Sequence, residues 1–403
     1  MASLLPALEA KDGELLRPAL AKLLKAELGQ IELHQTAGER FTGGKSTPVW
    51  KLSFVAKRGE KEKETRLVAK WVKPTTDLRR SSYVNEKQFY LSAAPRVRKF
   101  CRLPHMLMCE ENPESICFLF DDLTVDFPLH PENLEAAHAR ASLTWLARFH
   151  ACFWEADAAG GSFPAGMSGA DYWGLSLYWA LPTRAWSSGS EEISLNKGEN
   201  EERLSSVATA LTASSKTLKA HGAWEIAKTL GPRLSATARP LDAALRKGRG
   251  FVRNRSLLHG DFKTANFFLR EAEGGFEAAV LDFEFSGPGF VAVDLANFLF
   301  PDLRMDLLAV ERELLEFYHA QLMNSFDEFA TGGDFPLTTL LAHYALARCD
   351  YMRYMLGRGW TACSAGDARI VEAVDRDLQR LDGGQALSSE GYERAISELL
   401  ASS

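Results

Sequence analysis

Apolar residues recur along the chain with two different periods, and the two patterns predict helices and strands. Residues 14–28 place leucines at helical spacing with charged residues on the opposite face, which predicts a helix. Residues 32–72 contain three apolar runs separated by two polar turns, so we expect three strands joined as hairpins. Residues 83–94 return to helical spacing, and the apolar run at residues 116–120 predicts a buried strand.

The pattern becomes mainly helical after residue 131. We expect one long helix over residues 133–155, two helices over residues 201–247, and later helices over residues 334–360, 366–382 and 388–402. A sheet-forming part followed by a helical part is an α+β arrangement.

Two stretches rich in aromatic residues, 171–186 and 343–360, have two possible interpretations. Each forms either the wall of a ligand pocket or part of the core, because aromatic residues at helical spacing serve both purposes. If the second stretch lines a pocket, Asp350 beside aromatic rings would suit a cationic amine, and the rings alone would suit a flat apolar compound.

Composition narrows the classes of protein that fit this chain. It has 403 residues, with 46% hydrophobic and 25% charged residues, which is typical of globular proteins. The net charge of −6 does not favour a nucleic-acid partner. The six cysteines form no C-x-x-C pair, which fits a reducing compartment, and no stretch is long enough to span a membrane. The N-terminus lacks the basic region of a secretory signal, so we expect a cytoplasmic protein.

The stretch from residue 257 to residue 298 carries the chemistry. Asp261 ends one apolar run, Asn266 follows five residues later, and Asp282 ends a second apolar run. Asp261 is a candidate base for a hydroxyl proton. Asn266 and Asp282 offer the oxygen ligands that Mg²⁺ prefers. Phosphoryl transfer from ATP needs this set of groups, because the protein mainly positions the reactants and neutralises charge.

The turn at residues 43–47 resembles the end of a P-loop, but the spacing is wrong. The first glycine of that motif would fall at position 39, which is Glu39. Two interpretations stay open for this turn. It is either a glycine hairpin that covers phosphates with the backbone of Gly43, Gly44 and Ser46, or a simple tight turn.

Lys70 lies inside an apolar strand, where a charge is costly without an anionic partner. Glu86 follows sixteen residues later on the next predicted helix. A Lys–Glu pair between a strand and a helix, with the lysine on ATP phosphates, is the arrangement found in kinases. The alternative is an ordinary surface pair.

The fuller motif HGDFKTANF followed by DFE resembles the aminoglycoside phosphotransferase and choline kinase superfamily, most of all its ecdysteroid-kinase-like group. The resemblance covers roughly residues 30–360. It implies a two-lobed protein-kinase-like fold, in which a small lobe with an antiparallel sheet covers ATP and a larger helical lobe carries catalysis. It implies the cofactors ATP and Mg²⁺ and a hydroxyl compound as phosphate acceptor.

The resemblance also assigns roles to individual residues. Phe120 and Asp121 lie where the family connects its lobes and binds adenine through the backbone, with Asp121 in place of the usual glutamate. The resemblance thus places the domain boundary near residues 120–127, and we expect an N-terminal domain of residues 1–122 and a C-terminal domain of residues 123–403. Lys263 is a candidate contact to the transferred phosphate or a surface residue, and Glu284 a candidate second metal ligand. Asp294 resembles the aspartate that braces the catalytic loop, whereas His150 fits a packing role.

The segment between the metal-binding motif and the next helix bears on the substrate. Only eight residues, SGPGFVAV, separate Phe285 from Asp294, which leaves little room to dock a peptide and favours a small molecule. We therefore expect an ATP-dependent small-molecule kinase. The alternatives are a non-catalytic nucleotide-binding scaffold and a protein kinase. Choline-like amines, aminosugars, sterols and other alcohols all fit as acceptors, and the oligomeric state is open.

Overall fold

A computed structural model of the chain describes residues 4–25, 27–36, 49–58, 61–131, 134–155, 179, 181, 184–186, 192–194, 203–247, 254–302, 310–331 and 333–402. The chain forms two compact units. Unit 1 comprises Met1–Pro131 and Ala265–Asp282, and unit 2 comprises Glu132–Thr264 and Phe283–Ser403. The division into domains at residues 122 and 123 stays a prediction, whereas the antiparallel sheet and the helical part of the two-lobed α+β fold are both present.

Unit 1 is built on an antiparallel sheet of five strands in the order β1-β2-β3-β5-β4. Its strands are β1 (Glu27–Thr36), β2 (Val49–Arg58), β3 (Lys61–Val72), β4 (Met106–Glu111) and β5 (Ile116–Asp121). The three predicted strands of residues 32–72 and the buried strand at residues 116–120 are confirmed. Each residue of β3 from Leu67 to Val72 pairs with β5, so β3 is an interior strand with a partner on both sides.

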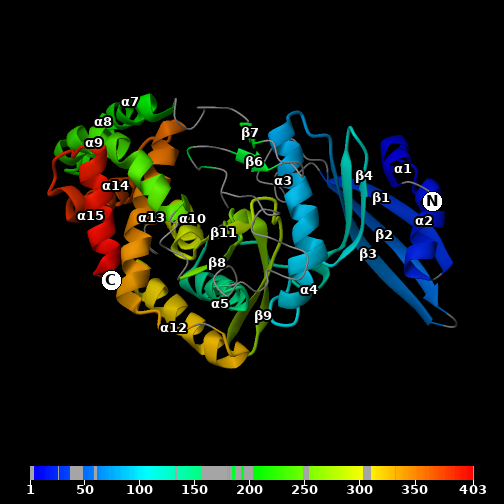
Figure 1. The fold of residues 1–403 in the computed structure, drawn as a ribbon. Helices are drawn as coiled ribbons and strands as arrows, with labels where there is room; N and C mark the ends of the chain where they lie inside the picture. The colour runs from blue at the N-terminus through cyan, green and yellow to red at the C-terminus, as the bar shows by residue number, and fades with distance from the viewer. Residues whose placement is uncertain are drawn as a thin grey trace. The chain divides into compact units, whose positions relative to one another are not determined.

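The two faces of the sheet have different partners, because successive residues of a strand point in opposite directions. Leu67 and Ala69 pack with α1 (Leu4–Ala10) and α2 (Gly13–Leu24) in one apolar cluster. Val68 and Lys70 point to the other face, the side of α3 (Asp77–Gln88). Figure 1 shows α1 and α2 on one side of the sheet and α3 on the other. The alternation within β3 therefore separates a packing face from a face that carries chemistry.

The helix predicted over residues 14–28 is shorter than expected. Asp12 caps its start by accepting a hydrogen bond from the backbone N–H of Glu14 (2.9 Å). The helix ends at Leu24, and Lys25 follows with φ 49°, in the left-handed region that terminates helices. Leu28 lies in β1 and is buried there. Pairing of β1 with β2 begins at Glu27, so sheet formation overrides the helical spacing of the leucines.

The helix predicted over residues 83–94 is confirmed, with an irregular second half. α3 starts at a Thr76 cap and continues through a π-helical turn (Phe89–Ala93) into α4 (Ala94–Val97). Unit 1 also contains a hairpin from late in the chain, β9 (Phe267–Ala272) and β10 (Gly275–Val280). Isolated bridges join it to Arg102 and Leu129, so the second half of the catalytic motif folds with unit 1.

Unit 2 is mainly helical. Its helices are α5 (Ala136–Cys152), α7 (Ser206–Ala213), α8 (Ser215–Ala220), α9 (Trp224–Asp242), α10 (Ala292–Asp302), α12 (Glu311–Phe329), α13 (Leu337–Gly357), α14 (Ala365–Asp382) and α15 (Ser389–Ala401). β8 (Arg255–Leu258) pairs with β11 (Gly287–Phe290), and β6 (Arg184–Trp186) pairs with β7 (Glu192–Ser194). The two C-terminal helices are confirmed at nearly the predicted bounds.

The described part of residues 201–247 forms three α-helices, not the two predicted. The breaks fall at Ser214, which separates α7 from α8, and at Gly222, whose φ of 77° turns the chain between α8 and α9. A glycine adopts this conformation without the steric cost that other residues meet. Within the described ranges, no helix is long and apolar enough to cross a membrane. All six cysteines are free thiols.

Candidate functional site

A buried lysine with two carboxylate partners lies at the centre of unit 1. The Nζ of Lys70 is 2.8 Å from Oε2 of Glu86 and 2.6 Å from Oδ1 of Asp282. Lys70 is 8% exposed, Glu86 1% and Asp282 6%. Asp282 is 212 residues from Lys70 in sequence, so the fold brings strand β3, helix α3 and the end of β10 to one point. We call these three residues the Lys70 cluster.

Asp282 has an unusual backbone conformation for a residue with a side chain. Its φ is 72°, in the left-handed region where aspartate is tolerated better than most residues. It closely follows the hairpin of β9 and β10, whose register pairs Phe267 with Val280. Residues held in this region cluster at functional sites, because the surrounding structure must hold them there. The strained turn directs the Asp282 carboxylate at the Lys70 ammonium group.

The Lys70 cluster forms the charged end of a pocket within unit 1. Val49 and Val68 of the sheet line the pocket with apolar side chains. Phe268 of β9 and Leu281, the residue after β10, also line it. Phe120, Asp121 and Tyr90 line it as well. The structure thus brings together Lys70, Glu86, Phe120, Asp121 and Asp282 from the predicted site. An apolar slot with a few placed charges is typical of sites for small molecules and cofactors.

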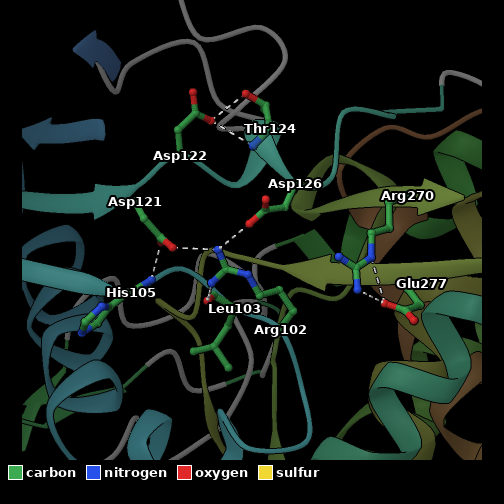
Figure 2. Close-up of polar contacts among 9 residues, drawn as sticks. All are labelled: Arg102, Leu103, His105, Asp121, Asp122, Thr124, Asp126, Arg270 and Glu277. Atoms are coloured by element: carbon green, nitrogen blue, oxygen red, sulfur yellow. Dashed lines mark hydrogen bonds and ion pairs between the residues drawn. The ribbon is translucent and has the colours of Figure 1, made fainter. Parts of the chain in front are cut away.

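The turn after β5 is fixed by its own carboxylates, as Figure 2 shows. Asp121 accepts hydrogen bonds from the backbone N–H of His105 (2.6 Å) and from Nη2 of Arg102 (2.7 Å). Asp122 accepts from the backbone N–H (2.9 Å) and the hydroxyl (2.6 Å) of Thr124. Both aspartates therefore shape the chain at the pocket edge. No local pattern in the sequence indicates Arg102 and His105 as partners of Asp121.

Asn266 and Asp282 lie at the same end of the hairpin. The backbone N–H of Leu281 donates to the carbonyl of Asn266 (2.9 Å), and the Asn266 side chain is fully buried. A carboxylate and an amide oxygen are hard donors that fit Mg²⁺, which completes its shell with phosphates and water. No cluster of three or more His, Cys, Asp or Glu side chains that could hold a metal occurs in the part of the chain that the structure describes. The residues thus fit a metal held jointly with a phosphate ligand.

Asp261 lies in unit 2, in the loop that follows β8. It is 3% exposed, and Nζ of Lys263 is 2.7 Å from its Oδ2. The backbone N–H of Asp261 donates to Nδ1 of His259 (3.2 Å), so His259 helps to hold the loop together. Gly260 adopts φ 82°, which lets the chain turn sharply just before the candidate base.

A buried relay of hydrogen bonds fixes this loop from behind. Asp294 on α10 accepts from the backbone N–H groups of His259 (2.7 Å) and Gly260 (2.9 Å). Its Oδ2 is 3.1 Å from Nε2 of His150 on α5, and Nδ1 of His150 is 2.7 Å from the hydroxyl of Tyr318 on α12. The relay therefore takes its side chains from α5, α10 and α12, three helices of unit 2 that are labelled in Figure 1.

The order of donors and acceptors in the relay follows from its charges. Burial lowers the pKa of His150, so the imidazole is neutral and has one N–H. Asp294 accepts two backbone hydrogen bonds and offers His150 an acceptor oxygen, so the imidazole proton is on Nε2. Nδ1 then accepts a hydrogen bond from the hydroxyl of Tyr318. Burial raises the pKa of this hydroxyl well above its ordinary value, so it keeps its proton. The predicted packing role of His150 is confirmed, and Tyr318, 168 residues away, was not foreseen.

The remaining predicted residues have different outcomes. Gly43, Gly44 and Ser46 lie outside the described residues, so their role stays a prediction. Glu284 is buried in unit 2, and its role as a metal ligand also stays a prediction. The suggestion that Asp350 binds an amine is wrong for this structure. Its side chain is fully buried and accepts two hydrogen bonds from Arg353 (2.9 and 2.8 Å).

The aromatic stretches pack as core where they are described. Trp179 is 1% exposed, and its ring centroid lies 4.9 Å from that of Tyr351 and 6.1 Å from that of Tyr354. Tyr351 and Tyr354 are buried as well. Most of residues 171–186 lie outside the described ranges, so the pocket interpretation of that stretch stays open.

Comparison with known proteins places this geometry in a family. The family described as "Phosphotransferase enzyme family" (APH) matches residues 121–329, which is just over half of the chain. No curated protein matches. The narrower likeness to the ecdysteroid-kinase-like group stays a prediction.

Several solved structures are similar to this chain at low identity. A microcompartment-associated aminopropanol kinase has 12% identity and a TM-score of 0.42, covering 96% of this chain and 98% of its own. An aminoglycoside-3'-phosphotransferase of type VIII has 14% identity and a TM-score of 0.37, covering 80% and 93%. A spectinomycin phosphotransferase in complex with ADP and spectinomycin has 11% identity and a TM-score of 0.40, covering 95% and 98%.

At such low identity, these structures do not indicate which acceptor this chain uses. The family to which the chain belongs is shown by the family match alone. The protein belongs to the phosphotransferase enzyme family: it is an ATP-binding kinase that phosphorylates a hydroxyl group of a small molecule.

Proposed function

We propose that the protein transfers the γ-phosphate of ATP to a hydroxyl group, with the nucleotide in the pocket of unit 1 and Asp261 as the catalytic base. The observation that carries the proposal is the Lys70 cluster, in which one ammonium group contacts two buried carboxylates beside an apolar slot. Kinases use this combination to hold ATP phosphates and the metal ions that accompany them.

In this mechanism each described side chain has a separate task. Val68 and Leu281 enclose the adenine base of the nucleotide. Lys70, which Glu86 orients, binds the phosphates. Asn266 and Asp282 would hold Mg²⁺, which neutralises phosphate charge when bound. With nucleotide and metal bound, Lys70 and Asp282 would each have a new partner of opposite charge in place of their direct contact.

Asp261 orients the acceptor hydroxyl and takes its proton as the oxygen attacks phosphorus. Lys263 forms an ion pair with Asp261 (2.7 Å) and is the candidate contact to the transferred phosphate. The relay through Asp294 holds the loop in place, so the base needs no rearrangement before the reaction.

Thermal unfolding with and without Mg-ATP tests the proposal. A ligand that binds the native state raises the apparent Tm by mass action, so wild type should show a shift that requires Mg²⁺. Asp282→Asn should lose the part of the Tm shift that depends on Mg²⁺. Asp261→Asn should keep it and yet lose turnover by roughly 10²–10⁴-fold. Asp327→Asn, an exposed residue of α12, is the matched control and should behave as wild type.

Two results would contradict the proposal. One is the absence of any Mg-ATP shift in wild type. The other is substantial residual turnover in Asp261→Asn, measured as ADP release over a panel of hydroxylated metabolites. A shift without turnover in wild type would instead indicate that the panel lacks the acceptor.

A further inference from the structure

Arg102 connects two parts of the pocket of unit 1 through its main chain and its side chain. Its carbonyl accepts a hydrogen bond from the backbone N–H of Val280 (3.2 Å), and Arg102 forms an isolated parallel bridge with Ala279. Val280 is the last residue of β10 and lies two residues before Asp282 of the Lys70 cluster. The strand that leads to Asp282 is therefore held against the backbone of Arg102.

The guanidinium group of Arg102 reaches the turn after β5, which forms another part of the same pocket. Its Nη2 donates to Oδ2 of Asp121 (2.7 Å) and lies 3.8 Å from Oδ2 of Asp126. Its Nη1 donates to the carbonyl of Leu103 (2.8 Å). Figure 2 shows the guanidinium between the carboxylates of Asp121 and Asp126. Because a guanidinium is a planar fork that holds its partners in a fixed geometry, the Arg102 side chain fixes the position of this turn.

Asp121 transmits this restraint to the wall of the pocket. Its Oδ1 accepts from the backbone N–H of His105 (2.6 Å), so both of its carboxylate oxygens have donors within the protein. The backbone of Asp121 pairs with Leu67 of β3, and Asp121 and Phe120 both line the pocket. A shift of the Asp121 carboxylate therefore displaces the backbone at the edge of the pocket.

Other contacts join the same two segments and keep them together without the Arg102 side chain. Leu129 and Leu269 exchange two backbone hydrogen bonds (3.0 and 2.7 Å). The Cζ of Arg270 lies 4.6 Å from the centroid of the Phe127 ring. The segment after β5 and the hairpin also share an apolar cluster, which consists of Leu123, Phe127, Phe268 and Ala279. Loss of the partly exposed Arg102 side chain should therefore change the spacing of the pocket walls without unfolding unit 1.

Resting on the proposed function, we propose that Arg102 is a positioning residue for Mg-ATP, which sets the span between the turn after β5 and the carboxylate of Asp282. In the proposed binding mode the adenine base lies beside the turn, and the phosphates with Mg²⁺ lie at Asp282. A ligand that reaches two places at once gains the full affinity of both only when their separation matches its own length. Arg102 sets this separation through Asp121 and Val280.

Three ligands that occupy different parts of the pocket test this role. Adenosine reaches only the base end, Mg-tripolyphosphate reaches only the phosphate end, and Mg-ATP spans both. Isothermal titration gives the Kd of each ligand for wild type and for Arg102→Gln. The variant should bind Mg-ATP roughly three- to tenfold more weakly, because only this ligand depends on the span. Adenosine and Mg-tripolyphosphate should bind within about twofold of wild type.

Arg80→Gln is the matched control in the same unit. Nη2 of Arg80 is 2.7 Å from Oε1 of Glu111, the same separation as between Arg102 and Asp121, and each arginine is 29% exposed at its side chain. Arg80 also donates to a backbone carbonyl, that of Pro113 (3.1 Å). The substitution removes a similar set of contacts from residues that do not line the pocket. All three ligands should therefore bind to this variant as they do to wild type.

Two further variants show whether the effect passes through Asp121 and depends on geometry. Because Arg102 acts through this carboxylate, adding Arg102→Gln to Asp121→Asn should weaken Mg-ATP binding by less than about twofold beyond Asp121→Asn alone. Arg102→Lys keeps the charge and loses the planar fork, so it should recover only part of the lost affinity. Retained adenosine binding shows that each variant is folded.

The outcomes separate the two proposals. Wild type that binds no Mg-ATP contradicts the proposed function, and the inference with it. Normal binding by wild type, with Mg-ATP bound equally well by Arg102→Gln, overturns the inference alone. An equal weakening of all three ligands also overturns it, because Arg102 then supports the pocket as a whole. Full recovery in Arg102→Lys, or an undiminished effect of Arg102→Gln beside Asp121→Asn, overturns it too, because the effect is then one of charge or of another partner.

Discussion

Two buried charge clusters, one in each unit, have similar electrostatics and different surroundings. In unit 1 the Lys70 ammonium contacts two carboxylates and lines a pocket. In unit 2 Arg233 of α9 bonds Asp382 through Nε (2.8 Å) and Nη2 (2.7 Å) and also contacts Asp375. The hydroxyl of Tyr392 donates to Asp382 as well (2.8 Å). We call the second group the Arg233 cluster.

The difference lies in how easily the partners can be exchanged. An ammonium group is a compact charge whose donors can turn towards a new anion, whereas a guanidinium is a planar fork that holds its carboxylates in a fixed geometry. The Arg233 cluster joins α9, α14 and α15 and is almost completely enclosed. Burial of charge alone therefore does not identify a functional site. A functional site is identified by a pocket beside the buried charge and by a partner that a ligand can replace.

The largest expected difference comes from removing the cation of each cluster. Arg233→Ala leaves two carboxylates in an enclosed site and should cost about 3–5 kcal/mol of unfolding free energy. Lys70→Met should cost less, because the pocket allows water and cations to reach Asp282, and it should abolish the Mg-ATP shift. Chemical denaturation of both variants checks this. If Lys70→Met were the less stable of the two, the proposed distinction between the clusters would not hold.

His343, a buried histidine of unit 2 outside the two clusters, shows how burial alone makes the stability depend on pH. Burial lowers the pKa of His343 from 6.5 to about 4, and its ring packs against Phe290 at 4.3 Å. Below pH 6.5 the unfolded state binds a proton that the folded state does not, so stability falls as the pH drops from about 6.5 to about 4. The full loss should be about 3 kcal/mol.

His343→Leu removes this titration and provides the comparison. Its unfolding free energy should fall less than that of wild type between pH 7 and pH 4, as measured by urea unfolding at each pH. Equal slopes for the two proteins would show that His343 is not the group responsible. Neither charge cluster is altered by this substitution, so the experiment isolates the contribution of burial.

The relay behind the catalytic loop should show a smaller effect. Tyr318→Phe removes the hydroxyl that donates to His150 and leaves a buried acceptor unsatisfied, which should cost about 1–3 kcal/mol. Turnover should also fall while the Mg-ATP shift stays, because the relay supports the loop of Asp261 and not the pocket of unit 1. An equal loss of nucleotide binding would argue against this division.

The smallest effect is expected at the turn after β5. Asp121 and Arg102 are each about one-third exposed at their side chains, and ion pairs of this kind contribute about 1 kcal/mol or less. Asp121→Asn should therefore change the unfolding free energy little and weaken Mg-ATP binding only modestly, by isothermal titration. A loss of binding as large as that in Lys70→Met would show that the carboxylate itself contacts the nucleotide.

Local patterns were enough to predict much of unit 1. The alternation in LVAKWV predicted that Lys70 lies within a strand between apolar neighbours, and the pairing of β3 with β2 and β5 confirms this. The helix over residues 14–28 was predicted too long because pairing between β1 and β2 is not visible in local spacing. Interactions between distant segments decided that boundary.

Long-range partners account for what could not be predicted in the site. Tyr318 and His150 are 168 residues apart, and no period or motif connects them. Arg102 and Asp121 are likewise joined only by the fold. Asp350 differs, because Arg353 follows it three residues later on one helix, a spacing at which opposite charges pair. That signal was present in the sequence and argues against an amine site.

The division into units has a practical consequence for work with fragments. The chain passes from one unit to the other at residues 131, 264 and 282, so neither unit is a single continuous segment. A fragment that stops at Pro131 would contain Lys70 and Glu86 without Asp282, and would lack the hairpin that encloses the pocket. A cut at this point would thus divide unit 1, whereas all of unit 2 lies in residues 132–403. Insertions and fusions are better placed at the ends of the chain than at the apparent junction.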